Sequence, residues 1–166
     1  LYVWFTPFQE KLSYPMIALI GGIYTKIGVY GLWRFFTTVF PYPMSTLQSI
    51  LLIVALFSMI FGIISSLYQH KIHHILSYLM ISQLGVAMFS FSLLTQTSIT
   101  YAFFFIFQHS LAIVSLFLLG DMIYRILGTD DIQSGGGLWR SAPVFSFLFF
   151  VQSLVFIGFP PFSGFW

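Results

Sequence analysis

Charge and cysteine are what this 166-residue sequence most clearly lacks. It contains six Lys or Arg and four Asp or Glu, whereas about a quarter of the residues of a soluble domain are charged. This scarcity excludes a globular domain surrounded by water. The net charge of +2 comes from so few groups that it gives no reason to expect nucleic-acid binding. Because cysteine is absent, a disulfide framework and thiolate chemistry are also excluded.

Motifs for hydrolysis and for nucleotide binding are missing as well. The sequence contains neither the HExxH pattern of zinc hydrolases nor the GxSxG turn that carries a nucleophilic serine. The Gly135-Gly136-Gly137 run lacks the Gly-Lys-Ser/Thr ending of a phosphate-binding loop. We therefore expect no cofactor, no metal and no catalytic residue, and we do not expect the chain to be an enzyme in its own right.

Hydrophobic residues make up 58% of the sequence and gather in runs of helical length. About 20 consecutive apolar residues are needed for a helix to cross a bilayer. The sequence therefore predicts an all-α, polytopic membrane helix bundle, with consecutive helices antiparallel because the linkers are short. The predicted spans are 16–40, 47–67, 75–94, 99–127 and 144–166.

Both ends of the sequence lie inside apolar runs, and its opening residues lack the basic n-region of a signal peptide, so we expect these residues not to be one. We interpret residues 1–166 as a single transmembrane region that is an internal fragment of a longer membrane protein.

The basic residues predict an orientation. Alternating loops place Lys11, Lys71, Arg125 and Arg140 on one side of the bundle and at most Arg34 on the other. Cytoplasmic loops of membrane proteins carry an excess of Lys and Arg. The side with four basic residues is therefore predicted to be cytoplasmic.

Lys26 is the leading candidate functional residue. It lies ten residues into the first span, which is almost wholly apolar until Arg34. At about 1.5 Å per residue this depth is about 15 Å, half the ~30 Å hydrocarbon thickness of a bilayer. Ionisable groups at that depth are costly and usually face a bundle interior or a wet cavity. The alternative, a side chain that extends to the membrane surface, fits poorly with this central position.

His109 lies at the same depth in the fourth span, ten residues from its start. Lysine and histidine side chains both bind and release protons, and histidine does so near neutral pH. The two residues are therefore candidates for a proton relay. A buried histidine bonded to a neighbouring carbonyl is the structural alternative. Hydroxyl and amide groups that could line the relay belong to Ser82, Gln83, Ser110 and Ser115.

The fifth span is interrupted by Gly158, Pro160, Pro161 and Gly164. Adjacent prolines remove backbone donors and clash with preceding carbonyls. Broken helices in membranes persist only against protein or a wet cavity, where they mark ion paths. The alternative is a helix that simply ends at the far interface. Residues 144–158 would span only about 22 Å at ~1.5 Å per residue, so a break within the membrane is favoured.

His70, His73 and His74 have the i, i+3, i+4 spacing that places side chains on one face of a helix. Such a face can bind a metal. Because no acidic or cysteine partner is nearby in the sequence and Lys71 would repel a cation, we predict a site where protons enter, or a structural cluster, rather than a metal site.

Several motifs carry a resemblance to a known family. Residues 25–30 read Thr-Lys-Ile-Gly-Val-Tyr, and residues 75–78 and 81–85 read Ile-Leu-Ser-Tyr and Ile-Ser-Gln-Leu-Gly. Residues 136–139 read Gly-Gly-Leu-Trp, and residues 158–165 read Gly-Phe-Pro-Pro-Phe-Ser-Gly-Phe. Together these motifs resemble the antiporter-like proton-translocating membrane subunits of complex I and of Mrp-type Na⁺/H⁺ antiporters. The D-type subunits of the Mrp antiporters are the most similar, and the likeness covers the whole chain.

The resemblance implies that the five spans are consecutive helices of a larger subunit built from inverted repeats, with the last helix broken. It implies that Lys26 and His109 belong to a central proton-transfer axis. The implied partners are the lipid bilayer, other membrane subunits of a hetero-oligomeric complex, protons and a monovalent cation such as Na⁺, in a bacterial cell membrane.

The sequence departs from the family pattern at several positions, among them Thr6, Pro7 and Gln9 near its start. Lys71 and His73 stand where many relatives show aspartate and lysine. Ile113 stands where many carry a second lysine on the histidine-bearing helix.

The sequence therefore leaves three functions open. The leading hypothesis is a subunit of a Na⁺/H⁺ antiporter. The alternative is a non-redox membrane-arm subunit of a complex I-type NADH:quinone oxidoreductase or of a membrane-bound hydrogenase. A degenerate structural subunit stays open because of Ile113.

Overall fold

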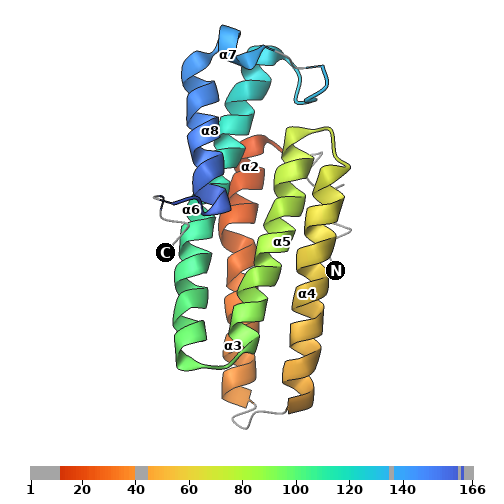
Figure 1. Ribbon diagram of the computed structural model, residues 1–166, viewed down its shortest axis with the longest axis vertical. Coiled ribbons are helices and arrows are strands. Elements are labelled where there is room, and N and C mark those ends of the chain that lie inside the picture. Colours follow the sequence, from red (N-terminus) through yellow and green to blue (C-terminus); the bar gives the residue numbers. More distant parts are fainter. Residues whose placement is uncertain (1–11, 40–44, 135–136, 161, 163–166) are drawn as a thin grey trace.

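The computed structural model describes residues 12–39, 45–134, 137–160 and 162, and its regular elements there are helices (Figure 1). The all-α bundle predicted from the sequence is confirmed. Because α2, a π-helical turn η1 and α3 follow one another without a gap, they form one continuous rod. The elements are α2 (Tyr14–Leu19), η1 (Ile20–Tyr24), α3 (Thr25–Val39), α4 (Ser45–Leu67), α5 (Ile72–Ser92), α6 (Gln96–Leu127), α7 (Leu138–Ser141) and α8 (Pro143–Ile157).

Four helices are long and apolar enough to cross a membrane, and they correspond to the first four predicted spans. The fifth predicted span corresponds to α8, an apolar helix of 15 residues. It ends at Ile157 because Gly158 adopts a left-handed backbone conformation, φ 80°, which terminates helices. Pro161 and Gly164 lie outside the described residues. The four long helices are Tyr14–Val39, Gln48–Leu67, Ile72–Ser92 and Gln96–Leu127.

The start of α6 shows how local polar groups set a helix boundary. The helix begins at Gln96, one turn before the predicted start, because Thr95 and Ser98 form a reciprocal capping box. Each hydroxyl oxygen accepts a hydrogen bond from the other residue's backbone N–H, at 3.2 Å in both cases. Such caps satisfy donors that the first helical turn leaves unpaired. A polar stretch that looked like a linker is therefore the first turn of the helix.

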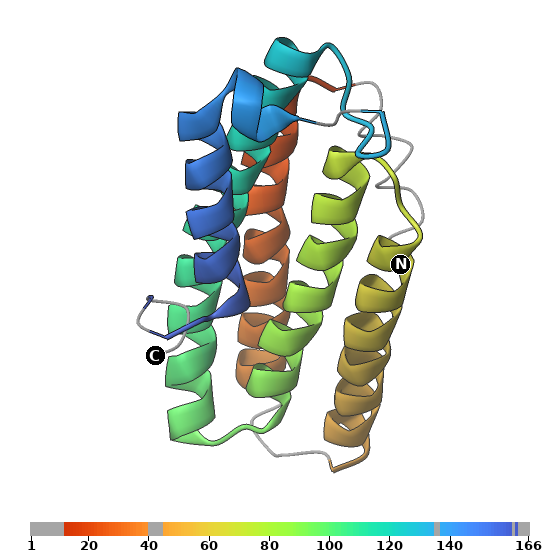
Figure 2. The same cartoon turned by 45° about the horizontal axis from the view of Figure 1, so that its top comes forward.

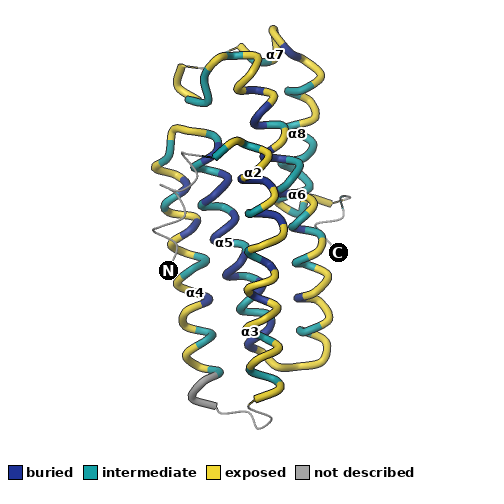
Figure 3. The backbone as a smooth tube through the Cα atoms, turned by 180° about the vertical axis from the view of Figure 1, so that it is seen from behind, coloured by how far each residue is buried: buried dark blue, intermediate teal, exposed yellow. Residues whose placement is uncertain are grey.

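Helix α5 lies in the middle of the bundle, with α4 on one side and α6 and the rod on the other (Figures 1 and 2). Buried residues accordingly run along α5, as the tube in Figure 3 shows, whereas much of α4 is exposed. The exposed side chains of α4 are large and apolar; Ile53 and Phe57, for example, are 66% and 71% exposed. Such a surface suits lipid rather than water.

Small residues allow α4 and α5 to pack closely. A Cβ atom at Gly62 would lie 2.6 Å from the backbone nitrogen of Ser82, so only glycine fits there. Two hydrogen bonds cross the interface in opposite directions: Ser58 Oγ donates to the Ile81 carbonyl at 3.3 Å, and Ser82 Oγ donates to the Met59 carbonyl at 3.1 Å. Close backbone approach and serine bonding of this kind hold membrane helices together.

Two apolar clusters fill the interior at different heights along the bundle. We call them the loop-side cluster and the far cluster, by their distance from the loop that joins α6 to α7. The loop-side cluster comprises Ile17, Ala18, Leu76, Met80, Ile113, Leu116 and Phe117. The far cluster comprises Val29, Leu84, Ala87, Phe91 and Ala102.

The segment between α6 and α7 folds back onto the start of α5. The backbone N–H of Ile72 donates to the carbonyl of Asp130, and that of Ile132 donates to the carbonyl of His70, both at 3.0 Å. An isolated antiparallel bridge pairs Lys71 with Asp131. These bonds bring a loop that follows α6 against the beginning of a helix that precedes it in the chain.

Candidate functional site

Lys26 is the second residue after the π-helical turn and lies at the midpoint of the rod. It is the thirteenth of the 26 residues Tyr14–Val39, and only 7% of it is exposed. Its Nζ donates to the carbonyl of Gly21 at 2.5 Å, and Thr25 Oγ1 donates to the same carbonyl at 2.8 Å. The side chain is therefore folded back along its own helix, inside the bundle and away from both ends. Single π-helical turns inside α-helices are uncommon and occur often at functional sites.

Two glycines allow the π-helical turn to pack closely against α5 and α6. A Cβ atom at Gly22 would lie 2.1 Å from Cγ2 of Val114 in α6, and one at Gly21 would lie 2.8 Å from Sδ of Met80 in α5. Larger residues would push the rod outward. The pair Gly21-Gly22 is thus the sequence signal for this turn, which our sequence analysis missed, together with the roles of Thr25 and of the Gly21 carbonyl.

His109 is buried in α6, at the fourteenth of its 32 residues, and is 5% exposed. Its ring packs on Phe105, with ring centroids 5.6 Å apart, and on Phe156 of α8, with centroids 4.7 Å apart. Its Nε2 is buried and has no hydrogen-bond partner among the described residues. A proton-binding nitrogen is therefore held in apolar surroundings.

The hydroxyl groups expected to line a relay bond to backbone carbonyls instead. Ser110 Oγ donates to Ile106 at 2.7 Å, Ser115 Oγ to Ala112 at 2.8 Å, and Ser82 Oγ to α4. Within the described parts of the chain, no side-chain hydrogen bond joins Lys26 to His109. Proton exchange between them would therefore need water to enter the layer.

Apolar packing separates this polar layer from both ends of the bundle. The loop-side cluster lies toward the start of the rod, and the far cluster begins one turn past Lys26, at Val29. Ile113, which stands where many relatives carry a lysine, is fully buried in the loop-side cluster. Along the bundle axis, the layer that contains Lys26 and His109 therefore lies between two apolar clusters.

The histidines at the start of α5 do not share one helical face. Because α5 begins at Ile72, His70 precedes the helix, and its Nδ1 lies 3.1 Å from Nε2 of Gln133. The expectation that no acidic partner is near was wrong, because the loop after α6 brings Asp130 against Nδ1 of His73. His74 packs its ring on that of His73, with centroids 4.2 Å apart. In the described residues, no group of three potential metal ligands converges.

A tyrosine completes the contact around Asp130. Tyr14, the first residue of α2, donates its hydroxyl to Asp130 Oδ2 at 3.3 Å, and its ring meets His73 edge-on at a centroid distance of 5.8 Å. Sequence reasoning missed Tyr14 and Asp130 because they lie 116 positions apart in the chain.

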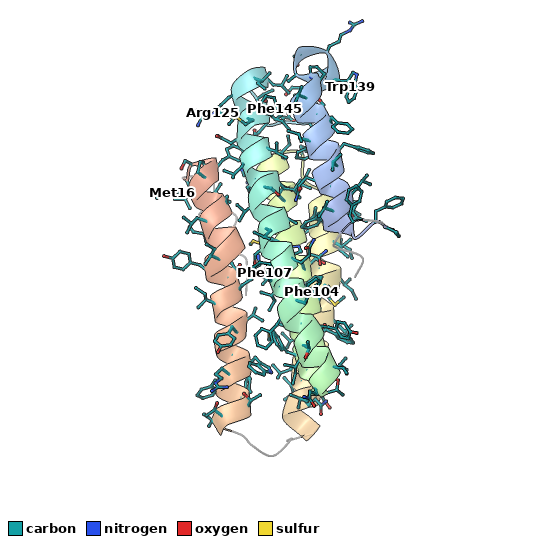
Figure 4. The ribbon with its side chains drawn as sticks, turned by 90° about the vertical axis from the view of Figure 1, so that its left-hand side faces the viewer. Met16, Phe104, Phe107, Arg125, Trp139 and Phe145 are labelled. Carbon is teal, nitrogen blue, oxygen red and sulfur yellow. The ribbon has the colours of Figure 1, made fainter. Side chains whose placement is uncertain are left out.

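The basic side chains that the structure describes lie as the topology predicted. Arg125, at the end of α6, and Trp139, beside Arg140 in α7, lie at the same end of the bundle (Figure 4). Lys71 precedes α5 at this end, and Lys11 lies outside the described residues. Arg34 lies in the later turns of α3, toward the opposite end.

These features together define a multi-pass membrane helix bundle with ionisable side chains buried at its middle. The chain belongs to the NADH:quinone oxidoreductase/Mrp antiporter transmembrane family, whose profile matches residues 1–166. The resemblance inferred from the motifs is thereby confirmed.

The chain is similar to several bacterial proteins of that family. It is 34% identical to the D-type subunit of the Na⁺/H⁺ antiporter of Alkalihalophilus pseudofirmus over 165 residues, which are 99% of this chain and 34% of the relative. The corresponding D-type antiporter protein of Bacillus subtilis is 30% identical, with the same coverage of 99% and 34%. The M-type subunit of the NADH-quinone oxidoreductase of Buchnera aphidicola is 30% identical over 145 residues, 84% of this chain and 28% of the relative. The chain thus spans about a third of the length of these relatives.

Proposed function

We propose that this chain is part of a membrane subunit of a Na⁺/H⁺ antiporter and that Lys26 and His109 carry protons through its centre. The observation that carries the proposal is the burial of Lys26 at mid-depth with a backbone carbonyl, and no carboxylate, as its hydrogen-bond partner among the described residues. Such an arrangement is costly for a merely structural side chain. Two relatives that cover almost all of this chain are named as subunits of Na⁺/H⁺ antiporters.

The proposed step is transfer of a proton between two buried basic groups. Like charges in one buried layer repel each other, so a proton on Lys26 would oppose a proton on His109. Because apolar clusters lie on both sides of the layer, proton transfer requires water to enter it. We propose that water comes past the end of α8, where the helix stops at Gly158 and Phe156 covers the His109 ring. Pro160 follows this end of α8, and its missing backbone donor fits the proposed break.

We further propose that protons reach the bundle from the end that carries His70, His73 and His74, and that this end faces the cytoplasm. Lys71, Arg125 and Arg140 lie at that end, in keeping with the excess of basic residues in cytoplasmic loops. The host membrane would be a bacterial cell membrane. Other membrane subunits would assemble around the chain, and Na⁺ would be the exchanged cation.

A second candidate is a non-redox membrane-arm subunit of an NADH:quinone oxidoreductase. It is favoured by the similarity to the M-type protein of Buchnera aphidicola. The same buried layer would then move protons in response to electron transfer in partner subunits. A requirement for NADH separates the two candidates, because an antiporter responds to an imposed Na⁺ gradient without an electron donor.

The test is Lys26→Ala in the full-length subunit within its assembled complex, measured in everted membrane vesicles. In the Lys26→Ala variant, we expect that added Na⁺ no longer dissipates an imposed pH gradient, although the complex still assembles. Gly28→Ala is the matched control, because a Cβ atom there meets nothing within 4 Å. Unchanged exchange in Lys26→Ala would remove Lys26 from the mechanism. If neither variant nor wild type responds to Na⁺ but NADH drives proton uptake, the second candidate replaces the first. A wild-type complex that moves no protons in either assay would indicate a structural subunit.

A further inference from the structure

We propose that Gln152 and Phe156 are positioning residues that hold α8 over His109 and thereby control when water reaches the imidazole ring. Helix α8 is then a lid on this ring, closed by Phe156 and tethered to α6 by Gln152. The role of the lid in proton transfer rests on the function proposed above, in which His109 carries protons. The covering of the ring by α8 can be tested without any measurement of transport.

Helix α8 is only partly buried in the bundle. None of its 15 residues is fully buried, although all of them lie in the described part of the chain. Phe149 and Phe156 are partly buried and pack against the loop-side cluster. With Gln152 they have the i, i+3, i+7 spacing that places side chains on one face of a helix. Segments with few buried contacts open more readily than a core, so α8 can separate from α6 while the rest of the bundle stays folded.

Two aromatic rings pack on His109, and they come from different helices. Phe105 lies four residues before His109 in α6, so it moves together with the imidazole. Phe156 belongs to α8, and its ring centroid lies 4.7 Å from that of the imidazole. The Nε2 atom of His109 is buried in this arrangement and has no hydrogen-bond partner among the described residues. Movement of α8 therefore takes one of the two rings away and opens the imidazole to water.

Gln152 ties α8 to α6 beside this contact. Its Nε2 donates to the carbonyl of Ala112 in α6 at 3.4 Å. Ala112 lies three residues after His109, and Gln152 lies four residues before Phe156. Because the two helices lie side by side and run in opposite directions (Figure 1), these spacings match, and the tether and the covering ring are neighbouring contacts of one interface.

The tether can be released without leaving its acceptor unpaired. N–H···O hydrogen bonds are usually about 2.9–3.0 Å long, so the bond of 3.4 Å from Gln152 is weak. The same Ala112 carbonyl also accepts Ser115 Oγ at 2.8 Å, and that bond stays within α6. A glutamine amide both donates and accepts hydrogen bonds. When α8 moves away, the amide of Gln152 therefore bonds to the water that enters.

The experiment measures modification of His109 by diethyl pyrocarbonate in the full-length subunit, within its assembled, lipid-embedded complex. This reagent acylates the neutral imidazole rings that it can reach, and mass spectrometry gives the rate at each histidine. His73, whose ring packs on Tyr14 and His74 at the start of α5, is followed in the same sample as an internal reference. We expect Phe156→Ala to raise the rate at His109 about tenfold, through loss of the aromatic contact, and to leave the rate at His73 unchanged.

The tether is tested by a second variant, and both variants have matched controls in α8. Gln152→Met keeps an unbranched side chain but removes the amide donor, so we expect the rate at His109 to rise about threefold. Ser153→Ala is its control, because Ser153 Oγ donates to the Phe149 carbonyl at 2.8 Å, within α8. Phe150→Ala is the control for Phe156→Ala, because Phe150 is 59% exposed. Neither control should change the rate at His109.

Equal rates at His109 in the wild type and in Phe156→Ala would overturn the lid. So would an equal rise in Phe150→Ala, or a parallel rise at His73, which would indicate that the whole bundle had loosened. An unchanged rate in Gln152→Met would overturn the tether, and this variant carries the test if Phe156→Ala does not assemble. Because the readout is modification of a ring and not ion exchange, failure of the Lys26 experiment leaves this result unaffected, and the reverse also holds.

Discussion

Two regions of this bundle hold ionisable side chains, and they are built in opposite ways. At the loop end, His73 has a carboxylate partner and Tyr14 donates to the same carboxylate. At mid-depth, the partner of Lys26 is a backbone carbonyl, and the Nε2 of His109 has no partner among the described residues. A buried ionisable group without a countercharge is costly. The ionisable groups of the middle layer should therefore destabilise the fold more than those at the loop end. The comparison supports our proposal that the middle layer serves transport rather than stability.

The largest effect is expected when the buried amine of Lys26 is removed, because this abolishes the difference between the two regions. Lys26→Met replaces the amine with an apolar side chain of similar length. We expect complete loss of Na⁺-dependent proton exchange, with stability of the complex unchanged or raised by up to about 4 kcal/mol, because well-packed apolar replacements of buried charges are often neutral or stabilising. Thermal unfolding of the purified complex, measured alongside exchange, checks both parts. A strongly destabilised complex would mean that Lys26 serves the fold.

The second-largest effect is expected from replacing Gly22, the glycine that lets the π-helical turn pack closely against α6. At Gly22, the Cβ atom of alanine would lie 2.1 Å from Cγ2 of Val114. Valine has few alternative rotamers, so we expect Gly22→Ala to cost about 1–3 kcal/mol through overpacking and to reduce exchange by displacing the Gly21 carbonyl.

Gly28→Ala in the same rod is the control, and it should be neutral or stabilise by about 0.5–1 kcal/mol, because its Cβ atom meets nothing within 4 Å. Equal effects of Gly22→Ala and Gly28→Ala on thermal unfolding would contradict close seating of the turn.

A smaller effect tests whether Thr25 supports Lys26. Thr25→Val removes one of the two side-chain donors to the Gly21 carbonyl. Thr37→Val is matched to it, because Thr37 Oγ1 donates to the Trp33 and Arg34 carbonyls at 3.1 Å, outside the layer. Both variants should cost about 1 kcal/mol in thermal unfolding. Only Thr25→Val should slow proton exchange; slowing by both would indicate a general effect of helix stability.

The smallest effect concerns the ion pair at the end of α6. Arg125 Nε lies 2.9 Å from Asp121 Oδ2, but the arginine side chain is 67% exposed. Because solvent screens such pairs, Arg125→Gln should cost less than about 0.5 kcal/mol. A larger loss in thermal unfolding would mean that this pair, and not His73 with Asp130, organises the loop end.

Much of the architecture followed from the sequence because apolar runs must bury their backbone polar groups in helices inside a membrane. The four long helices begin within a few residues of their predicted positions. Where the starts differ, as at Thr95, short-range capping decided them. The family could also be identified from the sequence, because its motifs are short runs of consecutive residues. The burial of Lys26 and His109 was expected from their depth alone.

The contacts that define the two polar regions needed the tertiary structure. The meeting of Tyr14, His73 and Asp130 depends on a loop folding back across the bundle, and no local pattern encodes it. The π-helical turn forms where Gly21 and Gly22 let the rod approach α5 and α6, so its cause lies in neighbouring helices. Hydropathy and helix length are properties of each segment by itself, and the sequence by itself therefore determined the helices and their membrane setting. Pairing, close approach and the separation of the polar regions by apolar packing are properties of segments in contact, and only the folded chain decided them.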